Sequence, residues 1–192
     1  MNKKVQELSK EELDINLAYA RVYDPKALAK LCEHYLPKIY QYVFYRVNRR
    51  EDAEDLTNEI CIKAIRNIRS QKGSFEAWLF RIASNMITDF YRRRGVRRKF
   101  EVHQDESQIV EERSGLADQL LTQAELKQAL LQLTDEQQEI ITLKFIEGFG
   151  NDEIAEMLGK SVGAIRALQF RALGSLRQLL SEKGSLEEEQ GD

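Results

Sequence analysis

The chain has 192 residues, of which 42% are hydrophobic and 32% charged, and its formal net charge is −3. Only two prolines and ten glycines interrupt it, so the composition favours a mostly helical fold. No apolar run approaches the roughly 18 residues of a membrane helix. The polar start MNKKVQELSKEELD does not resemble a signal peptide. We therefore expect a cytoplasmic protein without membrane insertion.

The chain lacks the residue patterns of common catalytic and metal sites. No CxxC, HExxH or ExxH occurs, and both glycine-rich phosphate-binding motifs are missing. His34 and His103 fall in no spacing typical of metal ligands. Cys32 and Cys61 stand far apart in apolar helical patterns, which favours two buried reduced thiols over a disulfide or redox switch. We expect no catalysis, no metal and no cofactor.

The first block with a helical apolar period covers about residues 13–100. Within it, apolar residues over 28–47 follow one another at steps of three and four, which predicts an amphipathic helix. Pro37 predicts a kink or local break in that helix. A second helix is expected over about 51–69, with its acidic residues gathered opposite the apolar side.

A third helix is expected over about 75–94, between the turn-forming stretch SQKGS and Gly95. The basic run RRRGVRRK, residues 92–99, continues the polar face of this helix, and aromatic residues stand nearby. Basic side chains that follow phosphates, together with aromatics that can accept an unstacked base, suit partly single-stranded DNA. Packing in the core is nevertheless the preferred role for Trp78 and Phe90.

A second apolar-periodic block covers about 116–180, after a polar, acidic stretch that we interpret as a linker. Its first helix is expected over about 117–132. The next is expected to begin after Thr134, which has the capping-box spacing to Gln137, and to end near Gly148. The final stretch, SEKGSLEEEQGD, is acidic and poor in apolar residues, so we expect it to be disordered.

The stretch NDEIAEMLGKSVGAIRALQFRAL, residues 151–173, predicts a helix-turn-helix. Ala155 is small where the helices would cross, and Gly159 can adopt the positive φ that the turn needs. The second helix of such a motif enters the major groove, where Arg166 can pair with a guanine or phosphate and Arg171 with the backbone. A helical hairpin without a DNA role is the alternative. The exposed side of the second helix is expected to carry Ser161, Gly163, Ala164, Arg166, Ala167, Gln169 and Phe170.

Three stretches, in this order, resemble bacterial RNA polymerase sigma factors of the extracytoplasmic-function group of the sigma-70 family. They are DAEDLTNEICIKA (52–64), GSFEAWLFRIASNMITDFYRRR (73–94) and LTDEQQEIITLKFIEGFGNDEIAEMLGKSVGAIRALQFRALGSLRQL (133–179). The resemblance implies an all-α fold of two small helical domains joined by a flexible linker. Its parts would be a sigma-two-like bundle over 10–99, a linker over 100–115, a sigma-four-like domain over 116–181 and an acidic tail over 182–192.

The resemblance also implies a role for each surface. In the family, the helix matching 52–64 binds the clamp helices of the polymerase β′ subunit, which assigns polymerase binding to Asp52, Asp55, Asn58 and Glu59. The helix matching 75–94 recognises and opens the −10 element, and the loop 71–74 captures a flipped base. This assigns −10 contacts to Lys72, Arg81, Asn85, Asp89, Arg92, Arg93 and Arg94. The helix-turn-helix reads the −35 element, which assigns contacts to Ser161, Gly163, Ala164, Arg166, Ala167, Gln169, Phe170 and Arg171.

The implied function is that of an alternative sigma factor, a non-catalytic subunit. It would bind core RNA polymerase at the β′ clamp helices and the β flap, direct initiation at specific promoters, and be controlled by an anti-sigma factor. A stand-alone DNA-binding regulator would leave the first block unexplained, and an enzyme using the carboxylates of the second helix would lack metal ligands. The net charge of −3 also disfavours strong binding to free DNA, which suits a subunit docked on polymerase.

Overall fold

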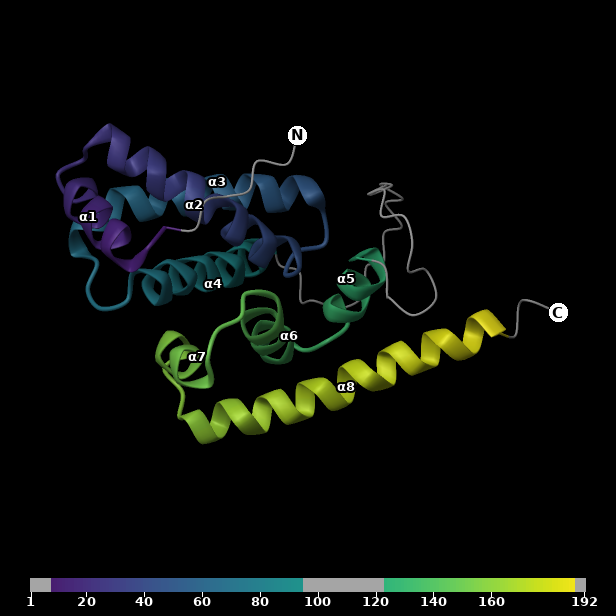
Figure 1. The fold of residues 1–192 in the computed structure, drawn as a ribbon. Coiled ribbons are helices and arrows are strands. Elements are labelled where there is room, and N and C mark those ends of the chain that lie inside the picture. The colour runs from purple at the N-terminus through teal and green to yellow at the C-terminus, as the bar shows by residue number, and fades with distance from the viewer. Residues whose placement is uncertain (1–7, 95–122, 189–192) are drawn as a thin grey trace.

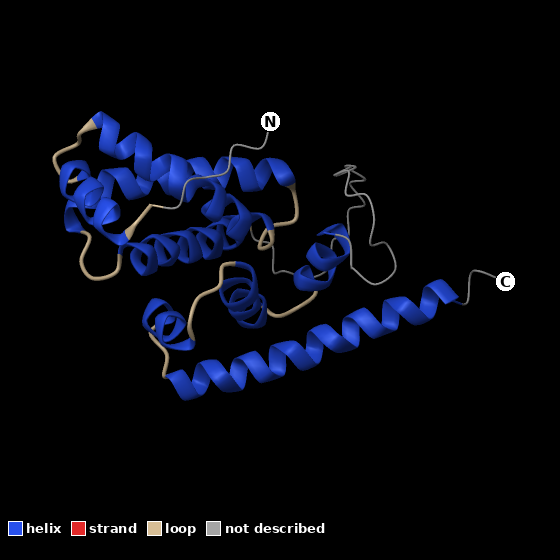
Figure 2. Cartoon of the chain, viewed as in Figure 1, coloured by secondary structure: helices blue, strands red, loops and turns tan. Residues whose placement is uncertain are grey.

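The computed structural model describes residues 8–94 and 123–188, with side chains up to residue 180, and this part contains helices and no strands (Figures 1 and 2). The N-terminal unit comprises α1 Lys10–Ala20, α2 Pro25–Phe44, α3 Arg50–Asn67, a short 3-10 turn Ile68–Ser70, and α4 Phe75–Arg93. The C-terminal unit comprises α5 Gln123–Leu131, α6 Asp135–Ile141, a π-helical turn Thr142–Ile146, α7 Asn151–Leu158 and α8 Val162–Glu188. The expected all-α fold with two helical domains is confirmed.

Capping side chains mark where α1 and α2 begin. The apolar period alone did not indicate a boundary between these two helices. Ser9 and Glu12 form a capping box at the start of α1. After α1, Tyr23 adopts a positive φ of 61°, and Asp24 then caps α2, accepting a 2.8 Å hydrogen bond from the Ala27 amide. The α2 helix runs through Pro37 to its end, so the expected local break is not found there.

The core of the N-terminal unit lies between α2, α3 and α4. Tyr42 on α2 and Phe80 on α4 are fully buried and meet edge to face at 5.2 Å between ring centroids. Ile60 on α3 and Ile39 on α2 complete this layer without exposed surface. The apolar stripes that the sequence period predicts therefore face one another, and the polar sides of α3 and α4 remain on the surface.

The predicted helix-turn-helix is confirmed as α7 and α8. Gly159 ends α7 in the left-handed conformation, with a φ of 63°. The Ser161 hydroxyl then accepts a hydrogen bond from the Ala164 amide at 3.2 Å, and so caps the start of α8. Ile154 and Ile165 are fully buried between the two helices, so the small core that the pattern indicated fixes their crossing.

Helix α8 continues to Glu188, which corrects the expectation of disorder across the acidic tail. A lone helix extension needs no core of its own when its residues favour the helical state. Leu, Glu and Lys in SEKGSLEE have high helix propensity, and the preceding turns already supply the nucleus. The expected linker, residues 100–115, and the first residues of the predicted helix from 117 lie outside the described residues.

The turn between α7 and α8 provides a test of the backbone geometry. We expect Gly159→Ala to lower the free energy of unfolding by about 1 kcal/mol, because an L side chain is strained at positive φ. Gly163→Ala is the matched control, since Gly163 lies in the first turn of α8 with open space around it. Urea unfolding of both variants measures the difference; equal stabilities would contradict a left-handed Gly159.

Candidate nucleic-acid interface

Helix α4 carries the polar face that the sequence assigned to the −10 element. Ser74 caps this helix through a 3.2 Å hydrogen bond from the Ala77 amide, which sets the register of every side chain that follows. Arg81, Asn85 and Arg92 are exposed on one side, and the opposite side is buried against α2 and α3. The division of α4 into a core side and a polar side is therefore as predicted.

The buried side chain of Gln71 stabilises the loop before α4 through hydrogen bonds. Its amide nitrogen donates to the Gly73 carbonyl at 2.7 Å, and its amide oxygen accepts from Arg21 at 2.8 Å. Gly73 has a φ of 70°, a conformation that favours glycine. Lys72 is left exposed at the tip of the loop, so a basic side chain projects from an ordered turn.

The C-terminal end of α4 is tied to the start of α3. Arg94 donates two hydrogen bonds to the carboxylate of Asp52, both at 2.8 Å, and its guanidinium lies 4.3 Å from the centroid of the Phe90 ring. Asp52 is consequently buried, whereas the sequence grouped it with the exposed acidic face. Asp89 pairs with Arg92 at 3.0 Å on the surface, and Arg93 is exposed beside them.

The acidic face of α3 is exposed at Asp55, Asn58 and Glu59. These positions follow one another at helical spacing and lie opposite the buried Leu56 and Ile60. A shallow hollow joins this face to the end of α4, because Asp55 and Glu59 line it together with Phe90 and Arg93. An acidic surface and a basic surface therefore adjoin on the N-terminal unit.

The second helix of the helix-turn-helix presents most of the side chains assigned to the −35 element. Phe170 is 81% exposed, and Arg166 and Arg171 are exposed on neighbouring turns. Ser161, Gly163 and Ala167 are also exposed, whereas Ala164 and Gln169 are half-buried. Sequence reasoning did not foresee that the Ser161 oxygen already accepts the capping hydrogen bond.

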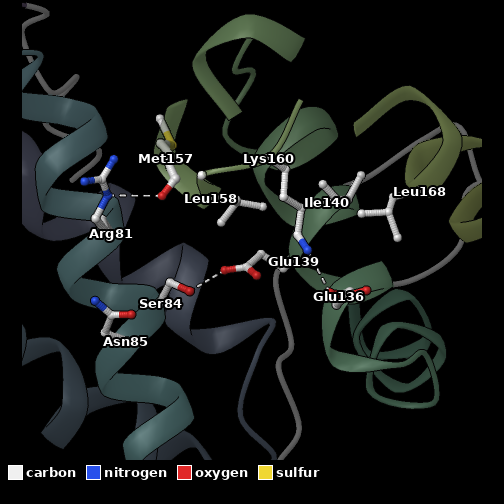
Figure 3. A pocket seen from close by; sticks show the side chains of 11 residues that line it. Arg81, Ser84, Asn85, Glu136, Glu139, Ile140, Met157, Leu158, Lys160 and Leu168 are labelled. Atoms are coloured by element: carbon white, nitrogen blue, oxygen red, sulfur yellow. Dashed lines mark hydrogen bonds and ion pairs between the residues drawn. The ribbon is translucent and has the colours of Figure 1, made fainter. Parts of the chain in front are cut away.

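The two units meet along α4, where Arg81 turns toward the helix-turn-helix (Figure 3). Its guanidinium donates to the main-chain oxygens of Met157 at 3.1 Å and Glu156 at 2.6 Å, at the C-terminal end of α7. A cation is favourable there because the last carbonyls of a helix carry a partial negative charge. One arginine assigned to DNA is thus engaged within the chain.

A buried polar cluster joins the units beside Arg81, and no motif or periodicity in the sequence predicts it. We call Glu139, Arg46, Tyr42 and Ser84 the Glu139 cluster. The Glu139 carboxylate pairs with Arg46 at 3.2 Å and accepts hydrogen bonds from Tyr42, at 3.1 Å, and from Ser84. Burial opposes ionisation of Glu139, but the Arg46 charge and these hydrogen bonds outweigh it and hold the pKa of the carboxyl below its ordinary value.

Two further groups between the units are titratable near neutral pH. Burial raises the pKa of the Glu147 carboxyl to about 8, against the nearby Lys38 charge and with the help of Glu76. Burial lowers the pKa of Lys127 to about 8, although the charge of Glu51 opposes this change. The Lys127 ammonium donates to the Asn48 carbonyl at 2.9 Å across the two units.

Across the described ranges 8–94 and 123–188, no cluster of ligand-type side chains that could hold a metal ion occurs. No helix in those ranges combines the length and apolar character needed to cross a membrane. Cys32 and Cys61 are both free thiols and half-buried. The described residues that the sequence singled out form charged, hydrogen-bonding surfaces on α3, α4 and α8.

The Asp52–Arg94 pair can be tested by removing the cation. We expect Arg94→Met to lower the free energy of unfolding by about 1–2 kcal/mol, because it leaves a carboxylate in a largely buried position. Arg92→Met is the control, since its pair with Asp89 is exposed and should contribute less than about 0.5 kcal/mol. Urea unfolding measures both; equal effects would contradict the buried pairing.

The raised pKa of Glu147 makes a pH-dependent contribution to stability. Between pH 4.5, near the ordinary pKa of a glutamate, and about pH 8, the folded state retains a proton that the unfolded chain releases. The wild type should therefore lose stability as pH rises through this range. We expect Glu147→Gln to gain roughly 1–2 kcal/mol over the wild type by pH 8, or about 2–8 °C in Tm.

Thermal unfolding from pH 4.5 to 9 measures this effect. Glu59→Gln is the control, because it makes the same chemical change at an exposed position and should show no growing difference across the range. A constant offset between Glu147→Gln and the wild type would contradict the raised pKa.

Comparison with known families matches both units separately. The model described as sigma-70 region 2 matches residues 31–97, and the model described as sigma-70 region 4 matches residues 123–176. The first match begins within α2 and covers α3 and α4, and the second covers α5 through α7 and ends at residue 176, within α8. The acidic face of α3 and the polar face of α4 therefore fall within the first matched region, and the exposed first turns of α8 fall within the second.

Several curated relatives are 30% or more identical to the chain over the aligned residues. The sigma factor SigW of Bacillus subtilis is 31% identical over 176 residues, which cover 83% of this chain and 91% of the relative. SigX of the same organism is 30% identical, with 77% and 80% covered. BldN of Streptomyces coelicolor is 33% identical over 85% of this chain, which spans only 64% of that longer relative.

Solved structures share the fold. The sigma factor RpoE of Bartonella quintana, solved with the anti-sigma factor NepR, has a TM-score of 0.58 and 25% identity, covering 90% of this chain and 96% of that one. CnrH, solved with the cytosolic domain of CnrY, has a TM-score of 0.67 at 23% identity and covers 88% and 96%. With both regions matched in order and relatives aligned over most of their length, the chain belongs to the extracytoplasmic-function RNA polymerase sigma factors of the sigma-70 family.

Proposed function

We propose that the chain is an alternative sigma factor that binds core RNA polymerase and directs initiation at promoters with defined −10 and −35 elements. The observation that carries this proposal is the combination of three surfaces in one chain. An acidic face on α3 adjoins a basic, aromatic-flanked face on α4, and a helix-turn-helix stands on a separate unit. A simple DNA-binding regulator has no use for the first two surfaces.

The polymerase-binding surface would be the exposed acidic face of α3, at Asp55, Asn58 and Glu59. Carboxylates at successive turns of one helix suit a basic partner surface, because opposite charges steer association and fix the register. Asp52 has a supporting role in this proposal, since its carboxylate is occupied by Arg94. The partner would be the clamp helices of the β′ subunit, with the β flap contacting the C-terminal unit.

The −10 contacts would come from α4 and the loop before it. Lys72, Arg92 and Arg93 are exposed cations that can follow phosphates, while Asn85 offers an amide that can pair with a base.

Gln71 holds the loop open at Gly73, where an extruded base could be received. Arg94 is engaged with Asp52 and would support the end of the helix more than contact DNA directly.

The −35 contacts would come from the first turns of α8 in a major groove. Arg166 is exposed near the N-terminal end of this helix, where base edges come nearest in this motif. Phe170 and Arg171 lie one turn further on and can meet a thymine methyl group or the backbone. The small residues Gly163 and Ala164 would let the helix approach the groove closely.

An anti-sigma factor would be the regulatory partner. Support comes from the RpoE structure, in which a protein of the same fold is held by an anti-sigma factor. The role assigned here is that of a non-catalytic subunit acting in the cytoplasm. It gains affinity for promoter DNA from polymerase, because the negative net charge of the chain opposes binding to DNA at long range.

In vitro transcription with core RNA polymerase tests the function. We expect Asp55→Arg to weaken binding to core polymerase at least tenfold, because it reverses a charge at the centre of the acidic face. Arg93→Glu should leave polymerase binding within twofold of the wild type and impair promoter opening.

Asp14→Arg is the matched control, since it makes the same charge change on the exposed side of α1, away from both surfaces. Circular dichroism confirms that each variant is folded. A chain that binds duplex DNA but not core polymerase would instead be a stand-alone regulator, and the proposed function would be wrong.

A further inference from the structure

We propose that Arg21 and Arg69 form a phosphate-binding extension of the −10 surface, beside the loop 71–74 and at the opposite end of α4 from its basic run. This surface holds the backbone of the separated DNA strand next to the captured base. The choice of promoter DNA as the ligand rests on the function proposed above, whereas the charged surface itself rests on contacts between described residues.

The turn between α1 and α2 is joined to the loop before α4 by two arginines. Arg21 follows the last residue of α1, and its guanidinium donates to the side-chain oxygen of Gln71 at 2.8 Å and to the Gln71 carbonyl at 3.5 Å. Arg69 precedes the loop, and its Nε donates to the Arg21 carbonyl at 3.0 Å. Because Gln71 in turn donates to the Gly73 carbonyl, both arginines lie beside the segment that would receive a base.

Tyr23 helps to fix the orientation of the Arg69 side chain. The backbone of Tyr23 is left-handed, with a φ of 61°, a conformation that an aromatic residue rarely adopts. The Arg69 guanidinium lies over the Tyr23 ring, 4.5 Å from the ring centroid. A strained backbone persists only where the surrounding structure maintains it, and such residues gather at functional sites. The ring contact and the hydrogen bond to Arg21 therefore hold an exposed cation in one place.

The acceptors that Arg21 and Arg69 bond to are neutral, so these contacts do not cancel the two positive charges. They are carbonyl oxygens and one side-chain amide oxygen. The cations at the other end of α4 differ, because Arg92 and Arg94 each pair with the carboxylate of an aspartate. A neutral acceptor orients a guanidinium and leaves its charge for a phosphate, whereas a carboxylate competes with the phosphate.

Lys72 adds a third cation at the tip of the same loop. Its side chain is exposed, as are those of Arg21 and Arg69. Arg21 stands 50 positions before Gln71, so the sequence shows no basic run that would reveal this cluster. Neighbouring cations around an aromatic ring suit a single strand, because they can follow successive phosphates while a base stacks nearby.

The two ends of α4 are too far apart to bind the same phosphate. The helix has 19 residues and is therefore about 28 Å long at 1.5 Å per residue. In the proposed function its polar face follows the DNA, with Asn85 near the middle and the base-receiving loop at its start. The strand that passes this loop next meets the turn with Arg21 and Arg69. The basic groups thus hold the DNA at both ends of the reading face.

Promoter opening by the reconstituted holoenzyme tests the contribution of these charges. On a promoter that the wild-type holoenzyme opens, Arg69→Met and Arg21→Met should each lower the equilibrium constant for opening about fivefold, the loss expected for one charge-assisted contact. Arg69→Lys keeps the charge and should stay within about twofold of the wild type. Arg66→Met is the matched control, because Arg66 is exposed near the end of α3 but lines a different hollow, with Met86.

Uncharged phosphates distinguish a direct contact from support of the loop. Single phosphates around the −10 element are replaced by methylphosphonates. At one position the wild type should lose opening while Arg69→Met loses nothing further, because the two changes remove the same contact. Losses that multiply at every position, or Arg69→Met and Arg21→Met holoenzymes that open the promoter as the wild type does, would overturn the inference. Circular dichroism and polymerase binding verify that each variant is folded.

Binding of the full chain to oligo(dT) at low salt separates this inference from the proposed function. Loss of one phosphate contact in Arg69→Met should reduce the slope of log affinity against log salt by about 0.7, and Arg66→Met should not change the slope. If the wild-type holoenzyme opens no promoter and this difference is found, the proposed function is refuted and the phosphate-binding surface stands. If Arg69→Met leaves both promoter opening and the slope unchanged, the surface is refuted and the function remains.

Discussion

The buried guanidinium of Arg46 is the constraint on which the arrangement of the two units depends. A charge with so little exposure needs an acceptor of opposite sign, and the chain supplies it from Glu139 on the other unit. Tyr42 lies between them, with its ring packed on Phe80 and its hydroxyl bonded to both charged groups. The core of the first unit and the position of the second are thereby linked through one side chain.

Most of the fold follows from local pattern, and its exceptions have physical causes. The apolar period over α2, α3 and α4 and the glycine-marked turn at Gly159 both specify short-range geometry, which a sequence can express directly. The boundary between α1 and α2 depends on caps at Ser9 and Asp24, which carry no apolar signal. The expectation of disorder across the acidic tail is wrong, because a helix that begins in a core can extend past that core.

The candidate surfaces were predictable to the extent that they are helix faces. Exposure of Asp55, Arg93 and Arg166 follows from periodicity alone. The pairing of Asp52 with Arg94 does not, because its partners stand 42 positions apart and belong to different helices. The Glu139 contacts span still longer separations, 97 positions in the case of Tyr42. Such pairs depend on how whole units dock, which no local pattern in a single sequence encodes.

The buried Gln71 gives the loop before α4 a property that matters for any ligand it receives. Because Gln71 bridges Arg21 and Gly73, the loop is already ordered without a partner. The conformational entropy of this segment is lost during folding, when core burial can compensate for it, and not during recognition. A preorganised loop of this kind discriminates through shape, since it cannot readily remodel itself around a ligand that does not fit.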